Sequence, residues 1–152
     1  MIFEGFFDQD ANLKIIASHG GGTLPYLIGR FEKGDEVEIP LRRQMKQKPS
    51  DYLRHIYYDT ITYNMGSLEY LIAVVGQEQV MFGTDWPHQV HDTKGAFANT
   101  AELSEKACAA VRGENAIRVF NITWILSSLC GWRPCTRITP TTTKEKTLLP
   151  KK

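Results

Sequence analysis

Two segments of this chain each join a short apolar run to a side chain that could do chemistry. The first runs from Leu13 to Gly22 and ends at His19 and three glycines; the second runs from Val80 to Pro87 and ends at a Gly-Thr-Asp sequence that contains Asp85. An imidazole can transfer protons near neutral pH, and a carboxylate can bind a divalent metal or accept a proton. Because the carboxyl ends of parallel strands surround the active site in α/β proteins, the two segments predict a metal site or an acid–base site.

The segment at His19 has three interpretations. A His-Gly-Gly-Gly sequence forms the oxyanion turn of some esterases, but that fold needs a Gly-x-Ser-x-Gly nucleophile, and no serine of this chain lies in such a motif. In the second interpretation, His19 acts from a strand end while the glycines offer backbone N–H groups to a carboxylate or to a metal-bound oxyanion. In the third, His19 is bonded within a tight turn.

The carboxylates at strand ends also have alternative interpretations. Asp85 could ligate a metal or act as a base, or it could close its strand in an Asx turn. Asp59 follows a further short apolar run at 56–58, and turn chemistry with Thr60 is its favoured interpretation. The spacing Asp85-x-x-His88-x-x-His91-Asp92 resembles a ligand cluster, but the proline after Trp86 excludes a regular helix there and favours a solvated loop.

Length and composition exclude several classes of protein. The 152 residues suffice for one domain but not for a complete (β/α)8 barrel of about 250 residues. The formal net charge of +1 indicates neither a nucleic-acid partner nor a membrane partner. No signal peptide and no run of about 18 apolar residues is present. Three cysteines without a Cys-x-x-Cys motif suggest a reducing compartment, so we expect a cytoplasmic protein.

The pattern of apolar residues predicts an α/β protein with a parallel sheet. Strands are expected at 13–17, 56–58 and 80–82, and helices at 25–31, 49–54, 68–75, 101–111 and 115–120. Gly76 and Gly113 are expected to end the third and fourth of these helices, and 34–47 is expected to be a loop.

The composition changes near Ile122. Residues 1–122 form the predicted α/β domain, and 123–152 form a divergent segment without clean periodicity. From Thr136 onward the chain is rich in threonine, lysine and proline, which predicts disorder because so little apolar surface could be buried.

Together these segments resemble the carboxyl-terminal part of the amidohydrolase-related, metal-dependent decarboxylases, the group typified by aminocarboxymuconate semialdehyde decarboxylase. The resemblance covers roughly residues 1 to 122 and implies about the last three βα units of a (β/α)8 TIM barrel. It rests on the order and spacing of these matching stretches: Leu13 to Gly22, Pro25 to Arg30, Tyr57 to Thr60, Val80 to Pro87 and Asn115 to Phe120.

The resemblance implies a role for three residues. In that family a divalent ion, usually zinc, is held by a His-x-His pair, a further histidine and an aspartate that Asp85 matches. His19 matches a histidine that activates the metal-bound water or transfers a proton, and Arg30 matches an arginine that binds the substrate carboxylate across a dimer interface. No His-x-His sequence occurs in this chain, so three of the four family ligands have no counterpart.

The resemblance implies a carboxy-lyase that acts on an unsaturated or aromatic carboxylic acid. Because most ligands are missing, we expect this chain to be truncated and inactive alone. Two alternatives stay open: a metal-dependent hydrolase of the same superfamily, and a non-catalytic fragment that associates as a homodimer or with a complementary half-barrel.

Overall fold

The computed structural model describes residues 1–10, 12–37 and 45–122. The predictions for the segment 123–152, including disorder from residue 136, lie outside the described residues. In chain order the elements are α1 (Phe6–Gln9), β1 (Ile15–Ala17), η1 (His19–Gly21), α2 (Ile28–Glu36), α3 (Pro49–Tyr52), η3 (Leu53–His55), β2 (Ile56–Asp59), α4 (Met65–Val75), η4 (Gln77–Gln79), β3 (Val80–Met81), α5 (Thr93–Ala101), α6 (Glu105–Ala109), η5 (Ala110–Glu114) and α7 (Asn115–Phe120).

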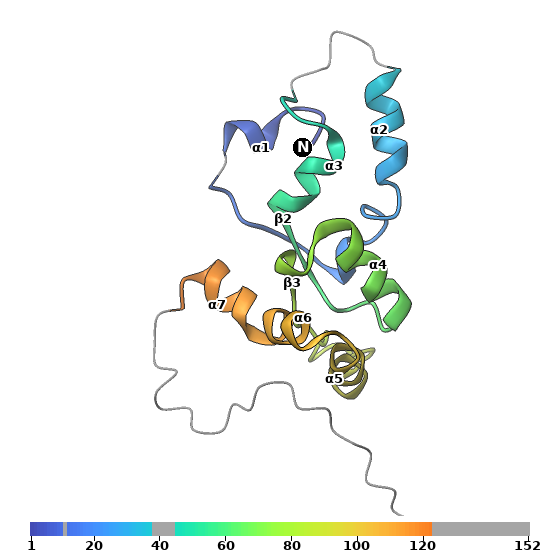
Figure 1. The fold of residues 1–152 in the computed structure, drawn as a ribbon, viewed down its shortest axis with the longest axis vertical. Coiled ribbons are helices and arrows are strands. Elements are labelled where there is room, and N and C mark those ends of the chain that lie inside the picture. Colours follow the sequence, from blue (N-terminus) through green and yellow to red (C-terminus); the bar gives the residue numbers. More distant parts are fainter. Residues whose placement is uncertain (11, 38–44, 123–152) are drawn as a thin grey trace, which may run out of the picture.

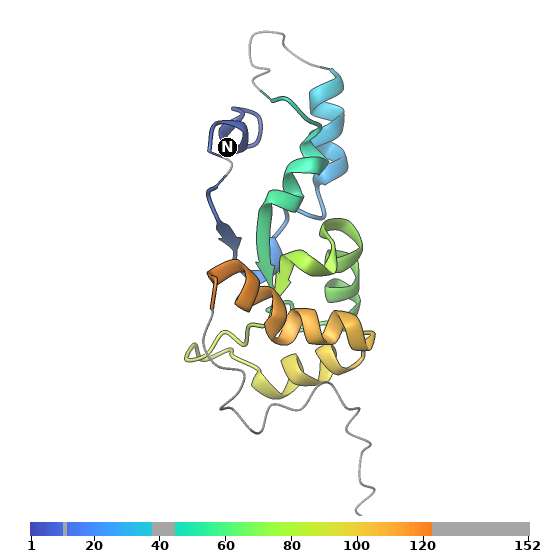
Figure 2. The ribbon, with the colours of Figure 1, turned by 60° about the vertical axis from the view of Figure 1, so that its left-hand side comes forward.

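The three strands form one parallel sheet in the order β1-β2-β3, which confirms the predicted strands and their direction. Ile15 pairs with Ile56, and Tyr58 pairs with Val80. The sheet lies between α1–α3 at one end of the molecule and α5–α7 at the other (Figures 1 and 2). Within the described residues, β1 and β3 pair with β2 alone, so each presents one unpaired edge.

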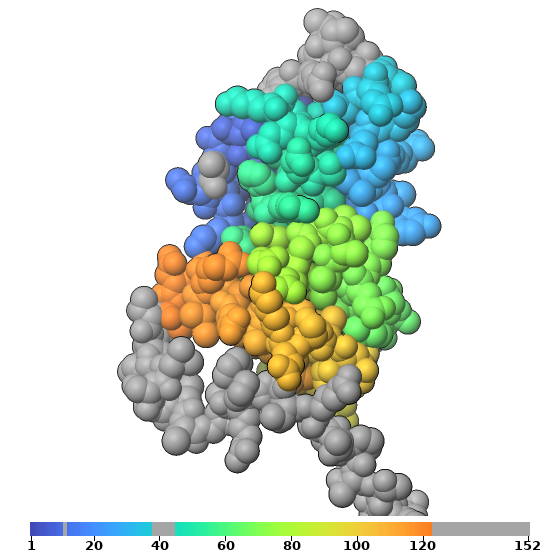
Figure 3. Space-filling view, viewed as in Figure 1, coloured from blue at the N-terminus to red at the C-terminus, as the bar shows by residue number. Residues whose placement is uncertain are grey.

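The core lies where the sheet meets α4. Tyr58 and Val80, from neighbouring strands, are fully buried in one cluster with apolar side chains of α4 and with Val111. The space-filling view shows α4, in green, packed between the amino-terminal elements and the carboxyl-terminal helices (Figure 3). Because successive strand residues face opposite sides, Ile16 and its register partner Tyr57 point away from this core, and Ile16 remains 43% exposed.

The helix predicted after the glycines begins later and continues further than expected. Residues 23–27 form turns, and α2 runs from Ile28 to Glu36 rather than over 25–31. The predicted loop over 34–47 is therefore wrong at its start, while 38–44 lie outside the described residues. α2 contains Gly34, a residue that is unfavourable within a helix, and a Lys33–Glu36 ion pair of 2.7 Å supports its last turn.

The helix predicted over 101–111 is wrong, because two helices meet there. Ser104 has an extended backbone and caps α6 by accepting a hydrogen bond from the Ala107 N–H, so α5 and α6 are separate. Gly113 does not end the second helix, which passes through the π-helical turn η5 into α7. At this wider turn the Val111 carbonyl accepts a hydrogen bond from the Phe82 N–H at 2.8 Å, which joins the turn to the end of β3.

The other predicted helices are confirmed. The structure forms α3 with η3 over 49–55, and α7 over 115–120. α4 covers the predicted 68–75 and begins one turn earlier, at Met65. Asn64 caps its start by accepting from the Ser67 N–H, and Gly76 follows its last residue, as predicted. No helix in the described ranges is long and apolar enough to span a membrane.

Candidate functional site

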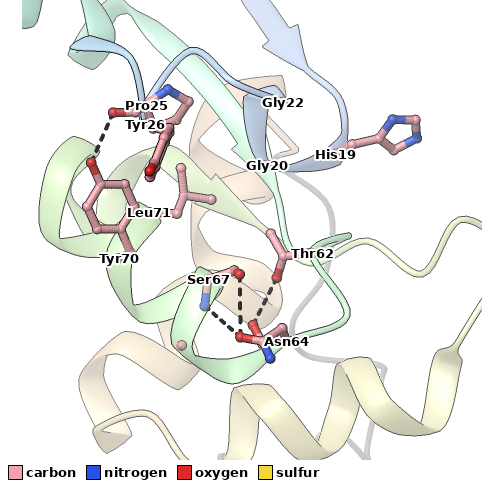
Figure 4. A pocket seen from close by; sticks show the side chains of 11 residues that line it. His19, Gly20, Gly22, Pro25, Tyr26, Thr62, Asn64, Ser67, Tyr70 and Leu71 are labelled. Atoms are coloured by element: carbon pink, nitrogen blue, oxygen red, sulfur yellow. Dashed lines mark hydrogen bonds between the residues drawn. The ribbon is translucent and has the colours of Figure 1, made fainter. Parts of the chain in front are cut away.

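His19 stands at the end of β1 in a turn that is left-handed over several residues. Its φ is 57°, and Gly20 and Gly21 follow with φ of 60° and 79°. Only glycine fits at Gly21, because an added Cβ would lie 2.6 Å from the buried Tyr58 ring. The turn sends the His19 ring outward, away from its own backbone (Figure 4), and its side chain is 64% exposed.

Asp85 stands at the end of the segment that follows β3, and the structure brings it to His19. The distance from His19 Nε2 to Asp85 Oδ1 is 3.8 Å, although β2 lies between the two strands that carry them. Asp85 also has a positive φ, 62°, and its side chain is only 21% exposed. A carboxylate this close to an imidazole can orient the ring.

Tyr63 contributes a second contact to Asp85. Its hydroxyl donates a hydrogen bond to Asp85 Oδ2 at 3.2 Å. Partial desolvation of the phenol raises the pKa of Tyr63, and the negative charge of Asp85 raises it further, so the hydroxyl stays protonated and remains a donor at neutral pH. The sequence interpretation did not include Tyr63, and no motif marks it.

Asp59 holds the turn that carries His19. Its Oδ2 accepts from the His19 N–H, and its Oδ1 accepts from the Gly20 N–H, both at 2.9 Å; Oδ1 also accepts from the Ile61 N–H at 3.0 Å. The bond to Ile61 is the predicted turn chemistry, whereas the bonds to the other strand end were not foreseen. The available signal was a carboxylate at the end of the middle strand, between two glycine-bearing strand ends.

Arg30 lies apart from the other two predicted site residues. It is exposed on the first turns of α2. Among the described residues, no hydrogen bond or ion pair joins it to His19 or Asp85. Its predicted role in binding a carboxylate across a dimer interface therefore stays a prediction.

The cluster of histidines after Asp85 is a loop, as expected. His88 and His91 are exposed, and the His91 ring contacts the His88 carbonyl at 2.6 Å. Asp92 accepts from the Gly95 N–H at 2.7 Å and so caps α5. Across the described ranges, no three histidine, cysteine or acidic side chains are placed to share a metal ion. His19 and Asp85 do not by themselves fit a metal centre, because such a centre needs three or four protein ligands.

A pocket of about 380 Å³ lies beside the His19 turn, between it and the start of α4 (Figure 4). Tyr26 and Tyr70 form one wall with ring centroids 6.4 Å apart, and the Tyr70 hydroxyl donates to the Pro25 carbonyl at 3.3 Å. The opposite wall is polar: the Thr62 hydroxyl donates to the carbonyl of Asn64, whose side chain caps α4. His19 is one of the residues that line this pocket, and its ring points away from the other lining side chains (Figure 4).

Comparison with known proteins shows the family of this chain. The amidohydrolase family profile matches residues 1–122, and the chain belongs to that family. It is similar to 2-amino-3-carboxymuconate-6-semialdehyde decarboxylase of Dictyostelium discoideum, with 29% identity over 125 residues, 80% of this chain and 35% of that protein. The resemblance to amidohydrolase-related decarboxylases is thereby confirmed.

Two solved structures share the fold. The structure of 5-carboxyvanillate decarboxylase from Sphingomonas paucimobilis matches with a TM-score of 0.70 and 31% identity, over 80% of this chain and 37% of that chain. Dihydroxybenzoic acid decarboxylase from Polaromonas, solved with manganese and the inhibitor 2-nitroresorcinol, matches with a TM-score of 0.70 and 26% identity, over 82% of this chain and 38% of that one. The chain therefore spans less than two fifths of these relatives, and its three strands match part of a barrel-like domain.

Proposed function

We propose that this chain carries part of the active site of a carboxy-lyase that removes CO2 from an aromatic or unsaturated carboxylic acid. The observation that carries the proposal is the approach of His19 and Asp85 to 3.8 Å at the carboxyl ends of parallel strands. Relatives whose names describe decarboxylases of aromatic acids support the substrate class. The strands would be about the last three βα units of a (β/α)8 barrel.

In this proposal the chain's own residues bind the acid and supply a proton. The bond between the carboxylate carbon and the substrate breaks, CO2 leaves, and the electron pair stays on the substrate carbon. The His19 imidazolium then donates its proton to that carbon and becomes a neutral imidazole, while Asp85 orients the ring. Arg30 would hold a substrate carboxylate in a bidentate contact, supplied across a dimer interface.

A divalent metal belongs to the proposal for the complete site, with Asp85 as one ligand. The manganese of the Polaromonas structure supports a divalent ion, and we propose zinc or manganese. Because Asp85 is the one ligand that we assign within the described residues, the remaining ligands must come from outside them, and we propose that the chain alone is inactive.

The test joins this whole chain to the part of the Polaromonas decarboxylase that it does not match. We expect the folded chimera to bind zinc or manganese and to release CO2 from dihydroxybenzoic acids, while this chain alone does neither. His19→Ala should lower the chimera's rate by about 10²- to 10⁴-fold. A folded, metal-loaded chimera without CO2 release would contradict the carboxy-lyase, and hydrolysis of esters or lactones in the same panel would establish the alternative hydrolase.

The second candidate is a non-catalytic partner in an assembly, and the sheet supports it. Both outer strands have an unpaired edge within the described residues, and Ile16 is 43% exposed on the face that points away from the core. A homodimer or a complementary half-barrel would cover these surfaces. Light scattering of the purified chain should then show a species larger than 17.3 kDa, whereas a compact monomer with protected strand amides would contradict this candidate.

A further inference from the structure

The end of the middle strand contacts both strand ends that carry the proposed site. Asp59 reaches toward the turn after β1, and its neighbour Thr60 reaches toward the segment after β3. We propose that Asp59 and Thr60 are positioning residues that together set the separation of His19 and Asp85. The significance of that separation rests on the proposed function, whereas the contacts themselves do not.

Asp59 determines where the His19 backbone lies. The carboxylate is 9% exposed, and it accepts from the N–H groups of His19 and Gly20, both at 2.9 Å. Hydrogen bonds to a carboxylate are stronger than those between neutral groups, and these two act on residues with φ of 57° and 60°. Since a left-handed backbone is unfavourable at a histidine, the Asp59 contacts offset the cost of keeping His19 in this turn.

Thr60 makes the equivalent contact on the other side. Its hydroxyl donates to the Gly83 carbonyl and accepts from the Gly83 N–H, both at 3.0 Å, and Thr60 is 3% exposed. Gly83 lies two residues before Asp85. One hydroxyl thus satisfies both backbone groups of Gly83 and fixes the path of the segment that leads to Asp85.

An independent feature shows that the two sides are packed together. A Cβ added to Gly83 would lie 3.2 Å from Asp59 Cβ and 3.2 Å from the Ile61 side chain. The Gly83 backbone therefore rests directly against the residue that holds the His19 turn. Tyr63, four residues after Asp59, adds its hydrogen bond to Asp85, so one short segment contacts both members of the pair.

The test uses nuclear magnetic resonance of the full 152-residue chain at one fixed pH. The variants are Asp59→Asn, which keeps the side-chain shape but replaces one acceptor oxygen with a donor, and Thr60→Val, which removes the hydroxyl. Thr60→Ser restores the hydroxyl and serves as the rescue. Asn115→Ala is the matched control, because Asn115 is a buried side chain, 3% exposed, that donates to the Gln77 and Val80 carbonyls near the start of β3.

The first readout is hydrogen exchange of single amides. Asp59→Asn should speed exchange at His19 and Gly20 by about tenfold or more and leave Gly83 unchanged. Thr60→Val should speed exchange at Gly83 and leave His19 and Gly20 unchanged, and Thr60→Ser should restore the slow exchange at Gly83. Uniform acceleration throughout the chain, or no change at these amides, would overturn the proposal.

The second readout reports the pair itself. The ¹⁵N shift of His19 Nε2 senses the Asp85 carboxylate, and Asp85→Asn defines its value without that charge. Asp59→Asn and Thr60→Val should each move the ¹⁵N shift toward the Asp85→Asn value. Asn115→Ala should lower the melting temperature and leave the ¹⁵N shift unchanged. A shift that follows stability alone would overturn the proposal, and either variant carries the test if the other fails to fold. No activity is measured, so failure of the carboxy-lyase chimera would leave this result standing.

Discussion

At the scale of single residues, the site depends on backbone conformations that most side chains avoid. His19, Tyr63 and Asp85 all have positive φ, and each belongs to the group that joins the two strand ends. Such strained positions persist where surrounding contacts hold them, and they concentrate at functional sites. Here the contacts come from Asp59, from Thr60 and from the glycines that allow a close approach.

Gly21→Ala should destabilise the protein. The added Cβ would meet the buried Tyr58 ring at 2.6 Å, and alanine is unfavourable at φ of 79°. We therefore expect the free energy of unfolding to fall by about 2–4 kcal/mol. The same substitution at Gly29, on a regular turn of α2 with open space around it, should stabilise by about 0.5–1 kcal/mol. Urea denaturation of both variants measures the difference, and equal effects would contradict the packing of the His19 turn against β2.

At the scale of elements, capping side chains decide where helices begin. Asn64, Asp92 and Ser104 each accept a hydrogen bond from a backbone N–H in the first turn of α4, α5 and α6. Asp92 lies next to His91 in a spacing that resembles a metal-ligand cluster, and in the structure its role is to cap α5.

Asp92→Ala should therefore act on stability. We expect the free energy of unfolding to fall by about 1 kcal/mol, because the Gly95 N–H loses its acceptor. Asp92→Ser should keep most of the original stability, since serine can also cap a helix. His88→Ala and His91→Ala, both on exposed side chains, should each change stability by less than about 0.5 kcal/mol. Thermal denaturation with and without zinc provides the measurement, and a zinc-dependent rise in melting temperature that both histidine variants abolish would instead identify a ligand cluster.

At the scale of the whole molecule, one hydrogen-bonded pair joins the amino terminus to the segment before β2. The Tyr52 hydroxyl donates to Asp8 on α1 and accepts from the N–H groups of Lys46 and Gln47. The hydrogen bond from Tyr52 lowers the pKa of Asp8, while burial, followed by that same bond, raises the pKa of Tyr52. Both shifts make the stability of the fold depend on pH.

Tyr52→Phe should flatten this dependence at both ends of the pH range. Because the folded pKa of Asp8 lies below its ordinary value of 3.8, Asp8 stabilises the fold above that pH, and this contribution is lost as the pH falls through the folded pKa. The Tyr52 contribution is present below its ordinary pKa of 10.0 and is lost as the pH rises through the folded value. Melting temperatures from pH 2 to 11 test this. Tyr70→Phe, which removes a hydroxyl bonded to a carbonyl, should keep the acid dependence of the original chain.

The sequence predicted the regular parts of the fold well. Each of the three strands is a short apolar run before a turn-forming residue, and that local pattern suffices because a buried strand needs little else. The prediction of a single helix over 101–111 failed, because the apolar spacing continues through the capping residue Ser104 and because Gly113 lies inside a π-helical turn. The Val111 carbonyl that β3 uses there is a tertiary partner, and spacing does not report it.

The sequence by itself determined the family, the order of the strands along the chain and the side chains at their ends, because glycine, proline and apolar runs act through local backbone geometry. Only the tertiary structure decided that His19 and Asp85 lie 3.8 Å apart across an intervening strand and that Asp59, Thr60 and Tyr63 hold them there. The physical reason is that these hydrogen bonds join residues 20 to 40 positions apart, and their geometry exists only once the parallel sheet has formed.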